Sequence, residues 1–308
     1  MLTGLYRVTA VCSRESGKAE AFGKRHGAVR CFTDLYEFAS WDEIDAVYIA
    51  TPNSLHYEQC LAMLKVGKHV IVEKPAFSNI GEAEKAFALA EKNGVLLFEA
   101  MRSIHEENHR IVKDAISQIG TVCGANLTFM KRSPRYDLVL DGEEPGIFSL
   151  KYSGGALMDL GVYLVYDAVD WFGVPEDASY FCQKAHTGAD TVGVAVLRYP
   201  GFEAVLNTGK TCGSQMPSEI RGRDKIILLD AAQSIKTVRL IDNEQNETVL
   251  SVPSNHWMED QARVFAGLIS GGKAAVSYQR LKQLALSVHE LMTKLRMGAG
   301  IVFPADEA

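Results

Sequence analysis

Residues 45–75 read DAVYIATPNSLHYEQCLAMLKVGKHVIVEKP, and the architecture of the first half of the chain can be inferred from this stretch. Residues 45–50 form a short apolar run bounded by turn residues, which is typical of a strand covered on both faces. Residues 54–65 carry apolar side chains at helical spacing, and Gly67 follows them as a helix C-cap would. Residues 69–72 predict a second buried strand. A strand, a helix and a strand in this order predict parallel pairing.

Each predicted strand is followed by a polar turn, T-P-N at residues 51–53 and E-K-P at residues 73–75. Ligands of open parallel sheets bind outside the carboxyl ends of the strands. Since parallel strands end at the same edge, we expect both turns on one rim of a binding site.

The motif A-T-P-N-x-x-H at residues 50–56, followed by G-K-H-V-x-x-E-K-P at residues 67–75, resembles the Gfo/Idh/MocA oxidoreductases. This group includes glucose-fructose oxidoreductase, inositol dehydrogenase and dihydrodiol dehydrogenase, and the resemblance covers nearly the whole chain. It implies reversible hydride transfer between NAD(P)(H) and a hydroxyl or carbonyl carbon of a sugar, cyclic polyol or dihydrodiol. It also implies a homodimer or homotetramer.

The rest of the chain predicts two domains. Helices are predicted at residues 16–26, 35–40 and about 79–93, and Asn79 with Glu82 three residues later indicates a capping box at the start of the last one. Strands alternate with these helices over residues 1–101, which predicts an α/β domain with a doubly wound, Rossmann-like parallel sheet. Residues 102–308 contain two closing helices, at 257–269 and 279–296, and short strands with period-two alternation at 121–131, 180–185, 192–199, 203–207, 226–230, 237–241 and 248–252. This pattern predicts an α+β domain with a mostly antiparallel, open sheet.

The start of the first domain departs from the expected pattern. No G-x-G-x-x-G occurs in the sequence, and residues 6–12 match the second strand of a dinucleotide-binding sheet rather than the first. We therefore expect a sheet that is incomplete at its start, with a gap at its centre. Either the sequence starts late, which the intact pattern elsewhere favours, or cofactor binding is weakened or lost. The second explanation leaves a rival function, a non-catalytic sugar- or nucleotide-sensing protein.

Three side chains are candidates for catalysis. The resemblance assigns Lys74 a hydrogen bond to the substrate oxygen beside the nicotinamide; the alternative is a solvated surface lysine. Asp159 and Tyr163 share a face of a predicted helix at residues 156–172, and Asp167 follows at the same spacing. A phenol near an ammonium can act as general acid or base, and tyrosine here resembles the dihydrodiol dehydrogenase and glucose-fructose oxidoreductase branch. We expect Tyr163 to move the proton, Asp159 to orient the substrate or the phenol, and Asp167 to contact substrate. The alternative is that Tyr163 is a core residue of an amphipathic helix.

The residues that contact the cofactor are predicted from the turns that follow the strands. Ser13 and Arg14 come after the strand at residues 6–12, where an acid contacts the ribose 2′-hydroxyl of NAD and an arginine accommodates a 2′-phosphate. Arg14 therefore favours NADP(H), with NAD(H) as the alternative. For His56 a structural role is an equal alternative. The expected cofactor contacts are Ser13, Arg14, Thr51, Pro52, Asn53, His56, Glu73 and Lys74.

A short motif offers a rival from another class. Residues 105–109 read HEENH, which matches the H-E-x-x-H helix of zinc hydrolases. A catalytic zinc needs a third protein ligand, and the motif is short. We therefore expect no metal, and we interpret Arg102 and His105 as candidate substrate-side residues.

Composition limits the partners and the cellular location that we expect for this protein. The net charge of -6 gives no support for a nucleic-acid partner. The sequence has no apolar run long enough to span a bilayer and no signal-peptide pattern, so we expect no membrane partner. Its six cysteines are scattered without a C-x-x-C pair, which favours a cytoplasmic location.

Overall fold

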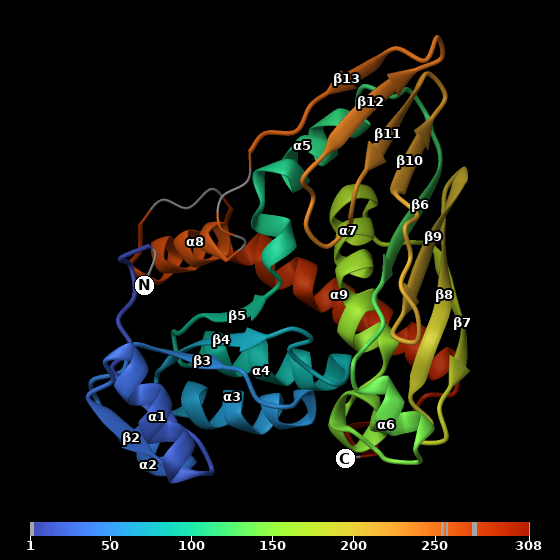
Figure 1. Cartoon of the computed structure of the whole chain (residues 1–308). Helices are drawn as coiled ribbons and strands as arrows, with labels where there is room; N and C mark the ends of the chain where they lie inside the picture. The colour runs from blue at the N-terminus through green and yellow to red at the C-terminus, as the bar shows by residue number, and fades with distance from the viewer. Residues whose placement is uncertain (1–2, 254–255, 257, 273–275, 308) are drawn as a thin grey trace.

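Strands and helices alternate up to residue 100, and strands dominate from residue 122 onward. The computed structural model describes residues 3–253, 256, 258–272 and 276–307. Figure 1 shows a small parallel sheet at the centre and a taller sheet beside it.

The predicted parallel strands form the small sheet. β3 (Ala46–Ile49), β4 (His69–Glu73) and β5 (Leu97–Ala100) pair in parallel in this order. α3 (His56–Lys65) joins β3 to β4, and α4 (Ile80–Lys92) joins β4 to β5. The turns after β3 and β4 therefore lie at the same edge of the sheet, as the sequence predicts.

The helix ends follow local sequence signals. Asn79 caps α4, because its Oδ1 accepts a hydrogen bond from the N–H of Glu82 at 2.9 Å. The Glu82 carboxylate in turn accepts from the N–H of Ser78 at 2.8 Å, which is a close variant of the predicted capping box. Gly67 follows α3 with a φ of 76°, a conformation that glycine adopts without strain.

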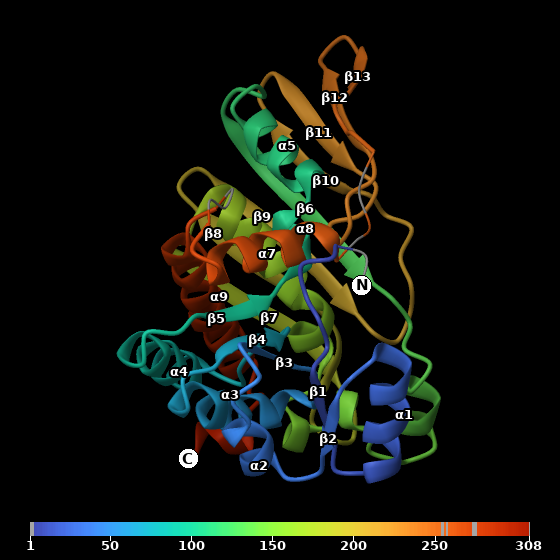
Figure 2. The same cartoon turned by 90° about the vertical axis from the view of Figure 1, so that its left-hand side faces the viewer.

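A separate two-stranded sheet precedes β3. β1 (Ala10–Cys12) pairs in parallel with β2 (Arg30–Phe32) through α1 (Ser16–His26), and α2 (Leu35–Ser40) leads on to β3. Both helices have their predicted bounds, whereas β1 is shorter than the strand predicted at residues 6–12. Figure 2 shows β1 and β2 beside β3, with α1 on the outer side.

The neighbouring edges of these two sheets do not pair. β1 bonds only to β2, and β3 bonds only to β4, among the residues that the structure describes. A cavity of about 810 Å³ is lined by both β1 and β3, by Ile71 of β4, and by Phe265 of α8 (Glu259–Ile269). The expected gap at the centre of the sheet is therefore confirmed.

The taller sheet has the strand order β13-β12-β11-β10-β6-β9-β8-β7, and only the pair β6–β9 is parallel. The prediction of a mostly antiparallel sheet is confirmed, but β10 was not expected. The strands are β6 (Val122–Met130), β7 (Asp177–Lys184), β8 (Asp190–Tyr199), β9 (Phe202–Gly209), β10 (Ser218–Gly222), β11 (Lys225–Leu229), β12 (Val238–Asp242) and β13 (Glu247–Val249).

Helices cover one face of this sheet, and the other face is bare in Figure 1. The covering helices are α5 (Glu107–Ile116), α7 (Val162–Phe172) and α9 (Tyr278–Gly298). The bare face exposes apolar side chains, such as Phe181 at 68%. A short helix, α6 (Tyr136–Leu140), lies in the segment before α7.

The C-terminal helices return to the first sheet. Phe265 of α8 stacks on Phe98 of β5 with 4.5 Å between ring centroids, and α9 packs against α4. One continuous apolar core therefore includes residues from both predicted domains, and the division into 1–101 and 102–308 stays a prediction. Trp257, where the sequence places the start of a helix, lies outside the described residues.

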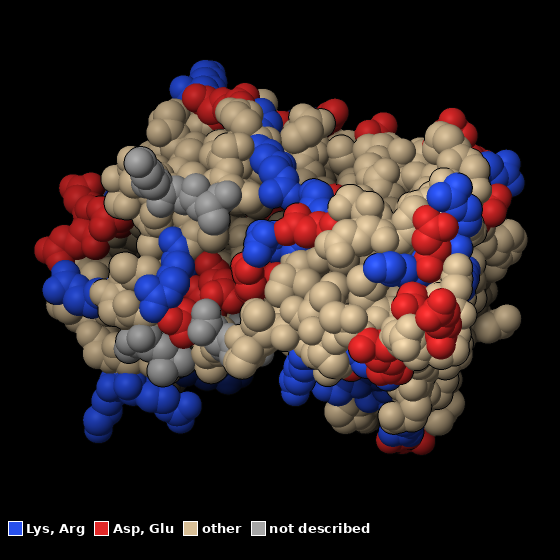
Figure 3. Space-filling view, turned by 90° about the horizontal axis from the view of Figure 1, so that it is seen from above, with Lys and Arg blue, Asp and Glu red and all other residues tan. Residues whose placement is uncertain are grey.

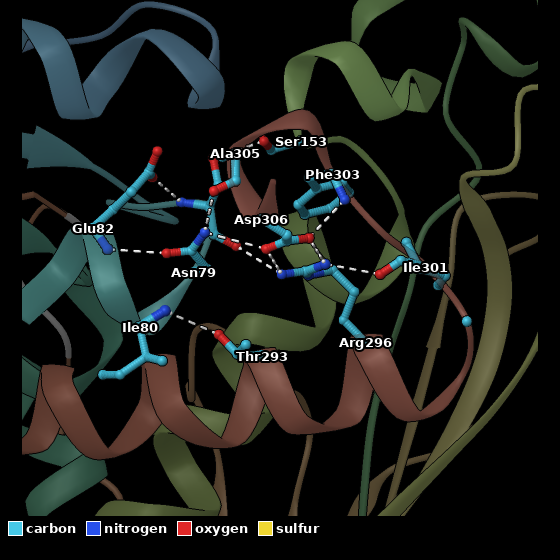
Figure 4. A network of polar contacts seen from close by, with 12 residues as sticks. Asn79, Ile80, Glu82, Ser153, Thr293, Arg296, Ile301, Phe303, Ala305 and Asp306 are labelled. Atoms are coloured by element: carbon cyan, nitrogen blue, oxygen red, sulfur yellow. Dashed lines mark hydrogen bonds and ion pairs between the residues drawn. The ribbon is translucent and has the colours of Figure 1, made fainter. Parts of the chain in front are cut away.

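A buried arginine at the end of α9 fixes the C-terminal segment to the first domain (Figure 4). Arg296 is 1% exposed and bonds both oxygens of Asp306, at 2.6 and 2.8 Å. It also donates to the carbonyl of Ser78, and Asn79 donates to the carbonyl of Ala305 at 2.8 Å. These bonds connect residues 296–306 to the segment that follows the E-K-P turn.

Candidate functional site

Lys74 lies directly after β4, and its side chain turns toward the second domain. Its Nζ donates to the backbone carbonyl of Asp159 at 2.8 Å and to Oδ1 of the same residue at 2.9 Å. Burial alone would lower the pKa of Lys74, but the Asp159 carboxylate outweighs it, so the pKa is raised. Lys74 is therefore a fixed ammonium and not a solvated surface lysine.

Asp159 holds two lysines at once. Its Oδ1 binds Lys74, and its Oδ2 accepts from Lys210, which follows β9 and is 3% exposed. Burial would raise the pKa of Asp159, but the two ammonium groups lower it below its usual range. Lys210 is not predicted as a site residue from the sequence, because a single lysine in the turn G-K-T-C forms no recognisable pattern.

A short irregular turn places Asp159. Residues Leu157–Gly161 form a π-helical turn before α7, a feature that is frequent at functional sites. Its start is anchored by the Asp190 carboxylate, which accepts from the N–H of Leu157 at 2.7 Å. Gly155 has a φ of 136°, and a Cβ there would lie 2.0 Å from Asp190 Oδ1, so only glycine fits.

Tyr163 lies on the first turn of α7 between two cations. Lys74 Nζ is 5.1 Å from the ring centroid, and the guanidinium of Arg102 is 5.6 Å from it. The ring also packs edge-on against Phe129, and the residue is 9% exposed. Its hydroxyl has no hydrogen-bond partner within the described part of the chain, which leaves it able to bond a ligand. Tyr163 is thus both a packed residue and a neighbour of Lys74.

His56 joins the two turns of the rim. Nδ1 lies 3.0 Å from the carbonyl of Pro75, Nε2 lies 2.9 Å from the carbonyl of Thr51, and the residue is 0% exposed. Burial lowers its pKa, so a neutral ring donates to one of these carbonyls. The prediction that His56 contacts the cofactor is not supported by this burial; the ring joins the T-P-N turn, which lines the cavity, to the E-K-P turn.

Two further rim residues have partners of their own. Glu73 accepts a hydrogen bond from the hydroxyl of Tyr48, a residue that the sequence analysis did not single out. Burial, and then the Glu73 carboxylate, raise the pKa of Tyr48. Asn53 donates to the carbonyl of Ser153 at 3.0 Å, which ties the first turn to the second domain.

Four of the eight residues expected to hold a cofactor line the cavity between β1 and β3, whereas Asn53, His56, Glu73 and Lys74 do not line it. Ser13, Arg14, Thr51 and Pro52 line it at the carboxyl ends of these strands. Arg14 and Thr51 are exposed there, and Arg14 has no ion-pair partner among the described residues. A free guanidinium beside two strand ends fits the phosphate of a nucleotide, although no glycine-rich turn accompanies it.

Asp167 lies elsewhere. It is 0% exposed, and its Oδ1 is 3.3 Å from Nε2 of His109 on α5. The prediction of a substrate contact is therefore not supported by the structure. The extra residue in the π-helical turn shifts the face of α7 relative to Asp159, which the regular spacing could not show.

The H-E-x-x-H motif does not form one helical face. His105 ends a 3-10 turn and packs edge-on against Phe265, whereas His109 lies in α5 against Trp171. Within the described residues, no group of three or more His, Cys, Asp or Glu side chains could hold a metal ion. The histidines of the motif therefore act as packing and ion-pair partners in this fold.

Two surface properties concern partners. Among the described residues, no helix is both apolar and long enough to cross a bilayer. On the face seen in Figure 3, basic and acidic side chains are interspersed rather than gathered by sign.

Two family models match the chain. The model for an oxidoreductase family with an NAD-binding Rossmann fold matches residues 2–101, and the GFO/IDH/MocA C-terminal domain model matches residues 109–227.

Several proteins are similar to this chain over most of its length. A scyllo-inositol 2-dehydrogenase (NADP(+)) from Bacillus subtilis is 37% identical, covering 98% of this chain and 92% of the relative. The uncharacterized oxidoreductase YgjR of Escherichia coli is 33% identical over 99% and 92%. The crystal structure of a 3-ketoreductase from Actinomadura kijaniata with NADP and TDP-benzene superposes with a TM-score of 0.82 at 25% identity, covering 95% of this chain and 89% of the other.

Proposed function

Because this chain belongs to the Gfo/Idh/MocA oxidoreductase family, we propose that it transfers a hydride between NADP(H) and a hydroxyl-bearing carbon of a cyclic polyol. The observation that carries the proposal is the buried Lys74–Asp159 pair at the carboxyl edge of β4. A cyclic polyol is preferred because the inositol dehydrogenase matches over nearly the full chain. Sugars and dihydrodiols are the alternatives, since relatives that act on them match about two thirds of it.

The chemistry follows from the charges at the site. Ser13 and Arg14 would hold NADP(H), which would supply the hydride acceptor in oxidation and the hydride donor in reduction. The raised pKa of Lys74 keeps it an ammonium at neutral pH, so it stabilises the alkoxide and is not the base. Tyr163 takes the hydroxyl proton in oxidation and returns it in reduction. Asp159 holds the ammonium in place through its carbonyl and carboxylate.

Cofactor binding is the first test. We expect NADPH to bind more tightly than NADH when nicotinamide fluorescence is titrated. Arg14→Ala should weaken NADPH binding roughly tenfold and leave NADH binding unchanged, because it removes one charge–phosphate contact. Arg25→Ala, which removes another exposed arginine in the last turn of α1, is the matched control. An equal loss of affinity for NADPH and NADH would show that Arg14 does not bind the 2′-phosphate.

Turnover of scyllo-inositol with NADP⁺ tests the catalytic roles. Lys74→Met should lower kcat by roughly a hundredfold or more, because it removes the donor to the developing oxyanion. Tyr163→Phe keeps the ring packing and should lower kcat by roughly 10²–10⁴-fold. Full turnover by the Tyr163→Phe variant would show that the proton-transfer assignment is wrong.

The gap in the sheet favours one second candidate. β1 and β3 leave a cavity between them, and the glycine-rich turn of a dinucleotide site is absent from the sequence. A sensing protein on the same fold would bind a nucleotide or sugar without turning it over. Micromolar NADPH binding, together with no turnover on a panel of polyols, sugars and dihydrodiols, would identify that role.

Assembly and location complete the proposal. We infer a homodimer or homotetramer that pairs through the bare face of the taller sheet, where Phe181 is exposed. Light scattering on wild type and on Phe181→Lys tests this, with a smaller mass expected for the variant. We place the protein in the cytoplasm, which fractionation of the producing cells would check.

A further inference from the structure

Both the backbone and the side chain of Lys210 are fixed by hydrogen bonds within the protein. Its N–H donates to the carbonyl of Thr191 at 2.7 Å, and its own carbonyl accepts from the N–H of Ser133 at 2.9 Å. Its side chain is 4% exposed and ends on Oδ2 of Asp159. Such a buried ammonium is costly unless it is paired, so its placement depends on that carboxylate.

The second ammonium changes the charge of the site. Lys74 and Asp159 alone form a neutral pair, whose attraction for a developing alkoxide is weak. With Lys210 on the other oxygen, the group of three carries one net positive charge. Each carboxylate oxygen then has its own partner, so Asp159 stays ionised and cannot turn both oxygens toward Lys74.

We propose that Lys210 is a positioning residue, which holds Asp159 ionised and oriented so that Lys74 presents a positive charge to the substrate oxygen. The inference rests on the proposed role of Lys74. It extends that role to a residue that acts through Asp159 and not directly on the substrate. A purely structural role is the competing explanation, since Lys210 Nζ also lies 5.8 Å from the ring of Phe148. That role predicts lower stability without any change in the titration of Lys74.

The titration of Lys74 distinguishes the two explanations. It can be followed by NMR with ¹³C-labelled lysine, and Lys74→Arg assigns the signal. Lys210→Met removes a neighbouring positive charge, so the pKa of Lys74 should rise by about one unit. Lys210→Arg keeps the charge and should restore the wild-type value. An unchanged Lys74 pKa in a folded Lys210→Met protein would overturn the proposal, and Lys210→Gln serves if the methionine variant does not fold.

Kinetics provide the second readout. With scyllo-inositol and NADP⁺, Lys210→Met should lower kcat roughly tenfold to a hundredfold and change KM much less, because the loss concerns the transition state. Lys210→Arg should recover most of the lost kcat. Equal kcat for all three proteins would contradict the role. If wild type does not turn over, the proposed function fails, but the NMR titration still decides the role of Lys210.

Discussion

Two largely buried ion pairs, Arg296–Asp306 and Arg102–Glu106, differ in the direction in which the pKa of the carboxylate is shifted. Asp306 beside Arg296 has a pKa below its usual range, because the bonds from Arg296, the Phe303 N–H and Asn79 outweigh its burial. Glu106 beside Arg102 has a pKa raised to about 7, because burial, with the nearby Asp167 carboxylate, outweighs the arginine.

One arginine does not by itself keep a buried carboxylate ionised. Asp306 receives both arms of Arg296 and two further donors. Glu106 accepts from Nη1 of Arg102 at 2.8 Å and shares its surroundings with a second anion. The number of hydrogen-bond donors to the carboxylate therefore decides which pair stabilises the fold at neutral pH.

Removing Arg296 should have the largest effect. Arg296→Met leaves a buried carboxylate without its main partner, so the free energy of unfolding should fall by about 3–5 kcal/mol. Chemical denaturation measures it. Arg239→Met, in the more exposed pair with Glu247, is the control and should cost about 0–1 kcal/mol. A similar small loss for both variants would mean that the Arg296 network does not hold the C-terminal segment.

The second-largest effect should be on the pH dependence of stability in acid. A carboxylate with a lowered pKa adds stability above its unfolded pKa, and loses it as the pH falls through the folded one. Wild type should therefore lose stability below about pH 4, near the ordinary aspartate value. Asp306→Asn should be less stable at pH 7 and show a flatter curve in acid. An unchanged acid limb would contradict the lowered pKa of Asp306.

Glu106 should give the smallest effect, with the opposite sign. Its pKa is raised to about 7, so its contribution is present at low pH and is lost as the pH rises through about 7. Glu106→Gln should reduce this decline when denaturation midpoints are compared between pH 5 and pH 8. A steeper decline in the variant would mean that Arg102 keeps Glu106 ionised.

Local signals were enough to predict much of the fold. The bounds of α1 and α2, the cap at Asn79 and the parallel order of β3 and β4 depend on neighbouring residues and on apolar periodicity. Lys210 was not found, because its role depends on a contact between segments distant in sequence. Asp167 was misplaced, since the spacing assumed a regular helix and the chain forms a π-helical turn at residues 157–161.

The return of residues 296–306 to the E-K-P turn also constrains the order of folding. The bond from Arg296 to the carbonyl of Ser78 and the bond from Asn79 to the carbonyl of Ala305 form only when the C-terminal residues are present. During synthesis the turn leaves the ribosome long before those residues do. The segment that follows the E-K-P turn therefore gains these two bonds only when synthesis of the chain is nearly finished.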